Sequence, residues 1–310
     1  NKALGFDRVY AQASTGKDDV ARFYDSGGDD QLKASPNSTS LAGNGFYNQA
    51  NGFNRTYAYS SGGDDVADLF DSMKNDEFVA SADHGYLRGA GFFNKAIGFA
   101  QVHAHASEGK DDVARLHDSK TNDVFEGGPD SSSLRGTGFS NRATGFDRVY
   151  GYSSGGEDTA QLSGSTSSDR FYSWVGKSVL RGDGYYTDVR GFKEVQTDLV
   201  SGRDDVAYLY DSDMTDTYVG LGSRGIWQAG GFTSLINRLD RVRAFSQGGG
   251  ADIAVLHASS TADFENDGSQ AVLKDSQTRH EMNRFEQVSL DGLVDDAYLA
   301  TLDHLFEFLP

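Results

Sequence analysis

Pairs of adjacent acids are the residues of this chain whose type and spacing most readily suggest chemistry. They recur after glycine-containing turns, at Asp18-Asp19, Asp64-Asp65, Asp111-Asp112, Glu157-Asp158 and Asp204-Asp205. Calcium is a hard cation that takes several carboxylate and carbonyl oxygens as ligands. The pairs therefore predict calcium ligands at Asp18, Asp19, Asp64, Asp65, Asp111, Asp112, Asp204 and Asp205. The alternative is that these carboxylates accept backbone N–H groups in tight turns. A pair that returns along the whole chain is a poor candidate for a single active site.

A second set consists of aromatic and histidine side chains that stand two residues apart, together with arginines further along. Side chains two residues apart on a strand point to the same side. Exposed aromatic rings can stack on sugars, and arginine can bind a carboxylate or sulfate through two hydrogen bonds. These positions predict a glycan-binding face made of Tyr57, Tyr59, His103, His105, Tyr150 and Tyr152 with Arg88, Arg135 and Arg181. The alternative is that tyrosine and arginine simply occupy the solvent side of strands, where tyrosine is favoured.

Histidines gather in the same part of the chain, at His84, His103, His105 and His117. A histidine beside Arg88 and Arg135 would suit a polysaccharide lyase, which needs a base near a neutralised uronate, although the link to this chemistry is by analogy with other β-helices. The chain has no phosphate-binding loop and no zinc-protease helix. We therefore predict no catalytic residues and expect a non-enzymatic protein, with the lyase as the alternative.

The elements that must position these residues belong to a repeat. A phenylalanine returns every 46 or 47 residues, at Phe6, Phe53, Phe99, Phe146, Phe192 and Phe285, with Leu239 in its place once. So regular a period indicates one structural unit copied in register. Within each unit, short runs of alternating apolar and polar residues indicate about five strands separated by turns rich in Gly, Asp, Asn and Ser.

Five short strands in each unit predict an all-β, parallel, right-handed β-helix with about two coils for every repeat. Equivalent side chains of successive repeats would then lie about 10 Å apart, close to the length of a disaccharide. A β-propeller is the alternative fold, because its blades have a similar length. We assign residues 1–290 to the repeat array. Apolar residues at helical spacing predict an amphipathic helix within residues 291–310, over 293–309, that covers the open end of the stack.

Composition limits the partners. The formal net charge of −18 argues against nucleic acid, the absence of Cys excludes disulfides and thiolate metal sites, and no apolar run is long enough to cross a membrane. We expect no membrane insertion, and no cofactor other than calcium. The chain begins partway into a repeat, so we expect it to be the C-terminal part of a longer protein. An open first coil would also permit end-to-end self-association.

The repeat itself resembles a known group of sequences. Residues 145–156, Gly-Phe-Asp-Arg-Val-Tyr-Gly-Tyr-Ser-Ser-Gly-Gly, and residues 113–119, Val-Ala-Arg-Leu-His-Asp-Ser, look like repeats of very large secreted or surface proteins of bacteria such as planctomycetes. Residues 62–69 resemble more weakly the calcium-binding repeat of RTX proteins, although here the motif returns only once in each unit. The resemblance implies a solenoid at an extracellular or cell-surface location, with a structural, adhesive or glycan-binding role and with polysaccharides or other surface proteins as partners.

Overall fold

The computed structural model describes residues 6–14, 16, 18–200, 204–276 and 278–292. Its described residues form strands and turns without a helix, and the coils stack as a β-solenoid. The prediction of an all-β solenoid is confirmed, and the propeller alternative is not supported. No observation tests the predicted right hand of the coil. The predicted helix over 293–309 lies outside the described residues, and the last described strand extends to Gly292.

Each repeat contributes five strands. The first two repeats comprise β1 (Arg8–Gln12), β2 (Val20–Tyr24), β3 (Gln31–Ala34), β4 (Ser38–Gly43) and β5 (Phe46–Asn51), followed by β6 (Arg55–Tyr59), β7 (Val66–Phe70), β8 (Glu77–Ala80), β9 (His84–Gly89) and β10 (Phe92–Ile97). The next two comprise β11 (Gln101–His105), β12 (Val113–His117), β13 (Val124–Gly127), β14 (Ser131–Gly136) and β15 (Phe139–Thr144), followed by β16 (Arg148–Tyr152), β17 (Thr159–Ser163), β18 (Arg170–Trp174), β19 (Lys177–Gly182) and β20 (Tyr185–Arg190).

The remaining strands continue the same order. They are β21 (Glu194–Asp198), β22 (Val206–Tyr210), β23 (Thr217–Leu221), β24 (Arg224–Ala229) and β25 (Phe232–Asn237), then β26 (Arg241–Phe245), β27 (Ile253–Ala258), β28 (Asp263–Asn266), β29 (Gln270–Lys274) and β30 (Arg279–Asn283), and finally β31 (Gln287–Gly292).

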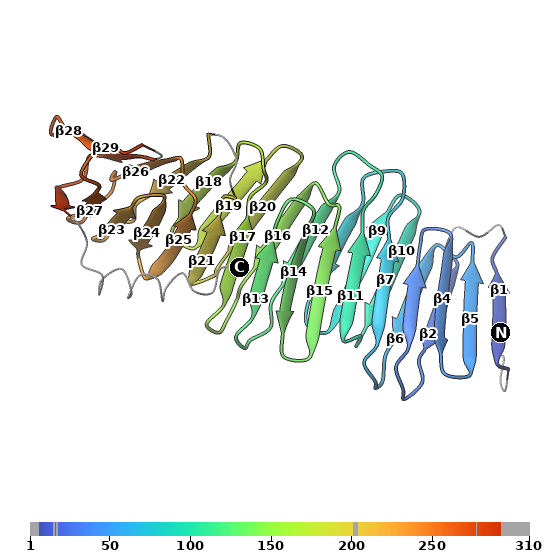
Figure 1. The fold of residues 1–310 in the computed structure, drawn as a ribbon. Helices are drawn as coiled ribbons and strands as arrows, with labels where there is room; N and C mark the ends of the chain where they lie inside the picture. Colours follow the sequence, from blue (N-terminus) through green and yellow to red (C-terminus); the bar gives the residue numbers. More distant parts are fainter. Residues whose placement is uncertain (1–5, 15, 17, 201–203, 277, 293–310) are drawn as a thin grey trace. The chain divides into compact units, whose positions relative to one another are not determined.

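The chain forms two compact units: residues 1–125 with 130–156, and residues 126–129 with 157–310. Each unit has two sheets, A and B. In the first unit, sheet A has the order β1-β5-β4-β3-β7-β11-β15-β14 and sheet B the order β2-β6-β10-β9-β8-β12-β16 (Figure 1). In the second unit, sheet A has the order β17-β21-β25-β24-β23-β27-β31 and sheet B the order β20-β19-β18-β22-β26-β30-β29-β28.

Alternation within the strands explains the core between the two sheets. In β7, Ala67 and Leu69 are fully buried while Asp68 between them faces outward. Side chains from the two sheets meet in this core, where Thr39 of sheet A and Thr56 of sheet B share a hydrogen bond of 3.0 Å. Small and apolar inward residues therefore hold the sheets together, and the outward residues are free to differ between repeats.

The path of one repeat differs from two parallel coils. β1 runs in sheet A, β2 crosses to sheet B, and β3, β4 and β5 return to sheet A as an antiparallel meander, in which β5 pairs in parallel with β1. The chain of one repeat thus passes through the two sheets three times, in the order A, B, A for the first repeat. Because three is odd, each repeat begins on the sheet opposite to the one before: β1, β11 and β21 lie in sheet A, and β6, β16 and β26 lie in sheet B.

This alternation changes the spacing of equivalent residues. In the first unit, β6 and β16 are five strand positions apart in sheet B, which is about 24 Å at the usual spacing between strands. The expectation of about 10 Å between equivalent side chains of successive repeats is therefore wrong. Equivalent residues share a face only in every second repeat.

Candidate functional site

In three of the pairs the second acid is buried and hydrogen-bonded to the backbone of a neighbouring coil. Asp65 Oδ1 accepts the Asp30 N–H and Asp112 Oδ1 accepts the Asp76 N–H, each over 2.7 Å. Asp205 makes the equivalent bond to Asp169. These hydrogen bonds agree with the alternative interpretation of the pairs, in which the carboxylates accept backbone N–H groups. Calcium binding by the pairs stays a prediction.

The first acid of each pair faces outward. Asp18 forms an exposed ion pair with Arg55 at 3.2 Å, and Asp111 forms one with Arg148 at 2.6 Å. Exposed pairs of this kind contribute little to stability. The members of a pair therefore have different surroundings, and the four outer acids Asp18, Asp64, Asp111 and Asp204 do not converge with the inner ones on one site.

Three groups of three aspartates do bring carboxylate oxygens within 4.8 Å of one another: Asp25, Asp30 and Asp65; Asp118, Asp123 and Asp158; and Asp211, Asp216 and Asp252. In the first group, Asp25 accepts two hydrogen bonds from Ser61, and Asp65 accepts a further one from Ser60. Burial raises the pKa of Asp65. Hydrogen bonds thus account for most of these oxygens, and Asp65 is the only one of the eight predicted calcium ligands that belongs to a group found among the described residues.

The histidines lie on different sheets. On β11 in sheet A, His103 Nδ1 lies 3.6 Å and His105 Nε2 lies 3.4 Å from Asp68 Oδ1. Burial is the main cause that lowers the pKa of His103. His84 and His117 belong to sheet B. Arg88 belongs to sheet B, where it pairs with Glu77, and Arg135 belongs to sheet A, so the two arginines do not flank one histidine; the lyase alternative stays a prediction.

The predicted glycan face is likewise divided. Tyr57, Tyr59, Tyr150 and Tyr152 belong to sheet B, whereas His103 and His105 belong to sheet A; of the arginines, Arg88 and Arg181 belong to sheet B and Arg135 to sheet A. The rings are also stacked on one another: Tyr59 on Tyr24 with centroids 5.2 Å apart, and Tyr152 on His117 at 4.7 Å. A ring face that is stacked on another ring is covered on that side, so these rings offer sugars less surface than expected.

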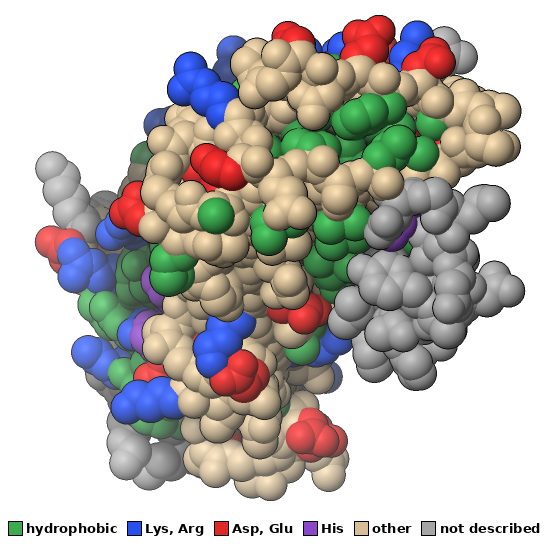
Figure 2. All heavy atoms as spheres, turned by 90° about the vertical axis from the view of Figure 1, so that its left-hand side faces the viewer, with side chains coloured by type: hydrophobic (Ala, Val, Ile, Leu, Met, Phe, Trp, Pro, Cys, Tyr) green, Lys and Arg blue, Asp and Glu red, His purple; other side chains and the backbone are tan. Residues whose placement is uncertain are grey.

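The structure brings together a set of cations that the sequence did not single out as one site. In sheet B of the second unit, neighbouring strands place their equivalent outward residues in one row: Arg181, Arg170, Val206, Arg241, Arg279 and Lys274. Five of these six positions are basic. We call this set the basic row. Basic side chains gather along the left side of the view in Figure 2, which looks from the end of the chain that carries β28.

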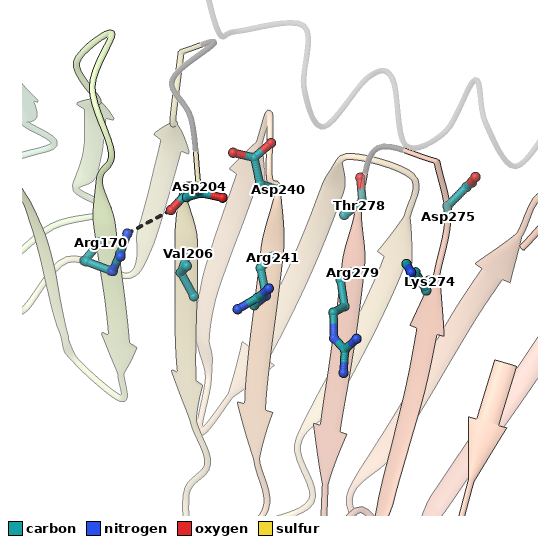
Figure 3. Close-up of a pocket in the computed structure, with 9 residues that line it drawn as sticks. All are labelled: Arg170, Asp204, Val206, Asp240, Arg241, Lys274, Asp275, Thr278 and Arg279. Atoms are coloured by element: carbon teal, nitrogen blue, oxygen red, sulfur yellow. Dashed lines mark hydrogen bonds between the residues drawn. The ribbon is translucent and has the colours of Figure 1, made fainter. Parts of the chain in front are cut away.

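Five of the six residues of the basic row, all except Arg181, line a groove of about 570 Å³. Figure 3 shows the side chains of Arg241, Arg279 and Lys274 along the sheet, with Asp204, Asp240 and Asp275 at the ends of the strands. Arg170 is tied to this rim, because its guanidinium donates to the backbone carbonyl of Asp204 over 2.8 Å. The groove therefore has a basic floor and an acidic edge.

One buried carboxylate contacts two of the arginines that line the groove. Glu281 accepts hydrogen bonds from Arg279 Nε at 2.5 Å and from Arg243 Nε at 2.9 Å, and Arg241 Nε lies 3.8 Å away. Only 6% of Glu281 is exposed. Three guanidinium groups around a single carboxylate leave an excess of positive charge, and their remaining N–H groups can donate to another anion.

Stacked aromatic rings lie beside the basic row. Tyr172 stacks on Tyr208 at 4.9 Å, Trp174 stacks on Tyr210 at 5.0 Å, and Tyr210 stacks on Phe245 at 5.4 Å. The Arg181 guanidinium lies 5.0 Å from the Tyr172 ring centroid. Stacking and cation–π contacts both stiffen this face, so the cations stand on a rigid surface.

The outer face of sheet A in the same unit has a different character. The outward positions of β21, β23, β25 and β27 hold Glu194, Gln196, Asp198, Thr217, Val219, Leu221, Thr233, Leu235, Asn237, Ile253, Val255 and His257, without any Lys or Arg. The neighbouring strand β24 adds one arginine, Arg224. The corresponding positions of β18, β22, β26 and β30 include Arg170, Arg241, Arg243 and Arg279 with one acid, Glu281. Basic charge is therefore concentrated on sheet B.

Comparison of the sequence with known proteins adds no family assignment: neither a protein-family model nor a curated protein matches it. In the part of the chain that the structure describes, none of the elements is a helix able to cross a membrane.

Proposed function

We propose that this chain is a non-enzymatic module that binds an acidic polysaccharide on the outer face of sheet B. The observation that carries the proposal is the basic row, with five cations at six adjacent positions, in a chain whose formal net charge is −18. The groove lining holds four cations and three aspartates, so a small excess of positive charge remains, which an anionic ligand would neutralise.

The spacing of the cations suits a linear polymer. Adjacent strands lie about 4.8 Å apart, so Arg241, Arg279 and Lys274 present positive charge at short, regular steps across the sheet. Arginine binds carboxylate and sulfate through parallel N–H bonds. A flat row of this kind favours an extended chain with an anionic group on successive sugars over a compact small molecule.

The aromatic rings have a supporting role in this proposal. Tyr208, Tyr210 and Trp174 stack mainly on neighbouring rings, so recognition would depend on charge more than on contact with the faces of sugars. A secreted or surface location fits such a ligand, and it remains part of the proposal. Association of copies through the first coil also stays a prediction.

The test is binding of the purified chain to immobilised polygalacturonate, dextran sulfate and uncharged dextran at several salt concentrations. Binding to both acidic polymers, none to dextran, and weakening as salt rises are the expected results, because salt screens charges on the surface. Equal retention on dextran, or no binding to any acidic polymer, would overturn the proposal. Absorbance of unsaturated uronates, followed in the same samples, should stay flat; a rise would favour the lyase alternative.

A further inference from the structure

A second groove in the first compact unit repeats the position of the groove that holds the basic row. It has a volume of about 480 Å³ and includes Asp18, Asn54, Arg55, Arg88 and Phe93. Each of these residues precedes a residue of the other groove by the same number of positions along the chain: Asp18 corresponds to Asp204, Asn54 to Asp240, Arg55 to Arg241, Arg88 to Lys274 and Phe93 to Arg279. The interval spans four repeats, an even number, so both grooves lie on sheet B.

The register of the strands confirms the correspondence. Phe93 lies between Arg55 of β6 and Arg88 of β9, as Arg279 lies between Arg241 of β26 and Lys274 of β29. The two grooves therefore have the same backbone frame. The side chains that line them differ.

The side chains of the first groove are less basic and more aromatic. Phe93 replaces Arg279, and the Tyr57 ring, which lies 5.7 Å from the Phe93 ring, replaces Arg243. Tyr86 stacks on Phe93, with ring centroids 5.3 Å apart, and covers one face of that ring. The Phe93 and Tyr57 rings meet at 45°, so they are tilted and not stacked face to face. This leaves part of an apolar ring surface within a groove that retains two arginines.

Both arginines already pair with an acid. Arg55 pairs with Asp18 at 3.2 Å, where both side chains are more than half exposed, and Arg88 pairs with Glu77. A guanidinium has five N–H donors, so each can keep its partner and still donate to a ligand carboxylate.

We propose that this groove is a second glycan subsite, which binds a uronate residue through one carboxylate and one apolar sugar face. The carboxylate is held by Arg55 and Arg88, and the sugar ring lies on Phe93 and Tyr57. The groove with the basic row, which has more cations and fewer open rings, takes the more densely charged sulfated chains. This inference rests on the proposed function and adds a second site with a different preference.

The test measures by calorimetry the affinity of the chain for short oligogalacturonate and, separately, for short dextran sulfate. The variants are Arg241→Gln/Arg279→Gln, which removes cations of the basic row, and Arg88→Gln, which changes the first groove. Arg142→Gln is the control, since Arg142 is an exposed arginine of the same compact unit but lies on β15 of sheet A. Thermal unfolding checks that each variant is folded.

We expect Arg88→Gln to weaken oligogalacturonate binding about tenfold, the effect of losing one charge-assisted pair, and to leave dextran sulfate binding unchanged. The basic-row variant should mainly weaken dextran sulfate binding, and Arg142→Gln should behave as the wild type. If Arg88→Gln has no effect on either ligand while the basic-row variant abolishes both, the second subsite is wrong and the proposed function stands. If the wild type binds neither ligand, both are wrong.

Discussion

The Tyr185 hydroxyl donates a hydrogen bond of 2.7 Å to Asp169 Oδ1 in the core of the fourth repeat. Burial raises the pKa of Tyr185, so the hydroxyl stays protonated and remains a donor. Two other repeats have Phe46 and Phe92 at this position, and there the equivalent oxygens, Asp30 Oδ1 and Asp76 Oδ1, are buried without a hydrogen-bond partner. One repeat thus satisfies a buried carboxylate oxygen that others leave unsatisfied.

Adding the missing donor should stabilise the fold. Phe92→Tyr places a hydroxyl beside Asp76 Oδ1, and we expect a gain of about 1 kcal/mol in the free energy of unfolding, measured by denaturant titration. Tyr185→Phe is the converse variant and should lose about 1 to 3 kcal/mol, because it leaves a buried carboxylate oxygen unpaired. A loss of stability in both variants would contradict this explanation.

A glycine faces the same carboxylate. A Cβ atom at Gly89 would lie 1.6 Å from Asp76 Oδ1, a distance at which the aspartate must move. We expect Gly89→Ala to lower the free energy of unfolding by about 3 kcal/mol or more, since it displaces a buried hydrogen-bonded group. Gly62→Ala is the control, because a Cβ there meets no atom within 4 Å. Equal stability of the two variants would show that the aspartate has room to move.

The buried acids predict how stability depends on pH. Burial, with the nearby charges of Asp71, Asp76 and Asp147, raises the pKa of Asp112 from 3.8 to about 6. The folded chain therefore holds this proton more tightly than the unfolded chain, so Asp112 destabilises the fold above about pH 6 and this effect disappears as pH falls from 6 toward 4. Thermal unfolding should show a higher midpoint at pH 5 than at pH 7.5.

The variant Asp112→Asn separates the effect of the Asp112 carboxylate on the pH dependence of stability from the effect of the net charge of the chain. The amide keeps an oxygen that can accept the Asp76 N–H but removes the buried negative charge. The variant should be more stable than the wild type at pH 7.5, with a smaller difference between pH 5 and pH 7.5. An unchanged pH profile would assign the effect to other carboxylates.

The fold class could be predicted from the sequence alone. The sheet to which each strand belongs, and so the face on which each outward residue lies, could not. The repeat interval and the alternation in runs such as Val66–Phe70 depend only on local burial, which is why the all-β solenoid could be predicted. The number of visits to each sheet depends on whether the last three strands of a repeat run parallel or antiparallel, and this was not predicted.

A local signal for the antiparallel arrangement was nevertheless present. Asn44-Gly45 forms the two-residue connection between β4 and β5, with Gly45 at a φ of 81°, and Asp183-Gly184 does the same between β19 and β20. Asn-Gly and Asp-Gly are typical of tight hairpins. These hairpins imply that each repeat passes through the two sheets three times. Equivalent residues of successive repeats then alternate between the sheets, with Arg55, Arg148 and Arg241 on one and Arg8, Gln101 and Glu194 on the other.

Glu281 offers a test of how the basic row is balanced. Glu281→Gln removes the single carboxylate among Arg241, Arg243 and Arg279. We expect affinity for dextran sulfate to rise several-fold, because three cations lose their internal anion, and the free energy of unfolding to fall by about 1 to 3 kcal/mol. Calorimetry and denaturant titration measure the two effects. Weaker binding by a folded variant would mean that Glu281 orients the arginines more than it neutralises them.

The most direct test of the central claim is the affinity of Arg241→Gln/Arg279→Gln for dextran sulfate, compared with that of Arg224→Gln. Arg224 lies on β24 of sheet A in the same compact unit, so the control also removes an arginine from this unit but leaves sheet B intact. Binding through the basic row predicts a loss of about 100-fold in the double variant, from two charge-assisted pairs, and almost none in the control. Equal losses in both would contradict the account, because affinity would then follow net charge and not a site on sheet B.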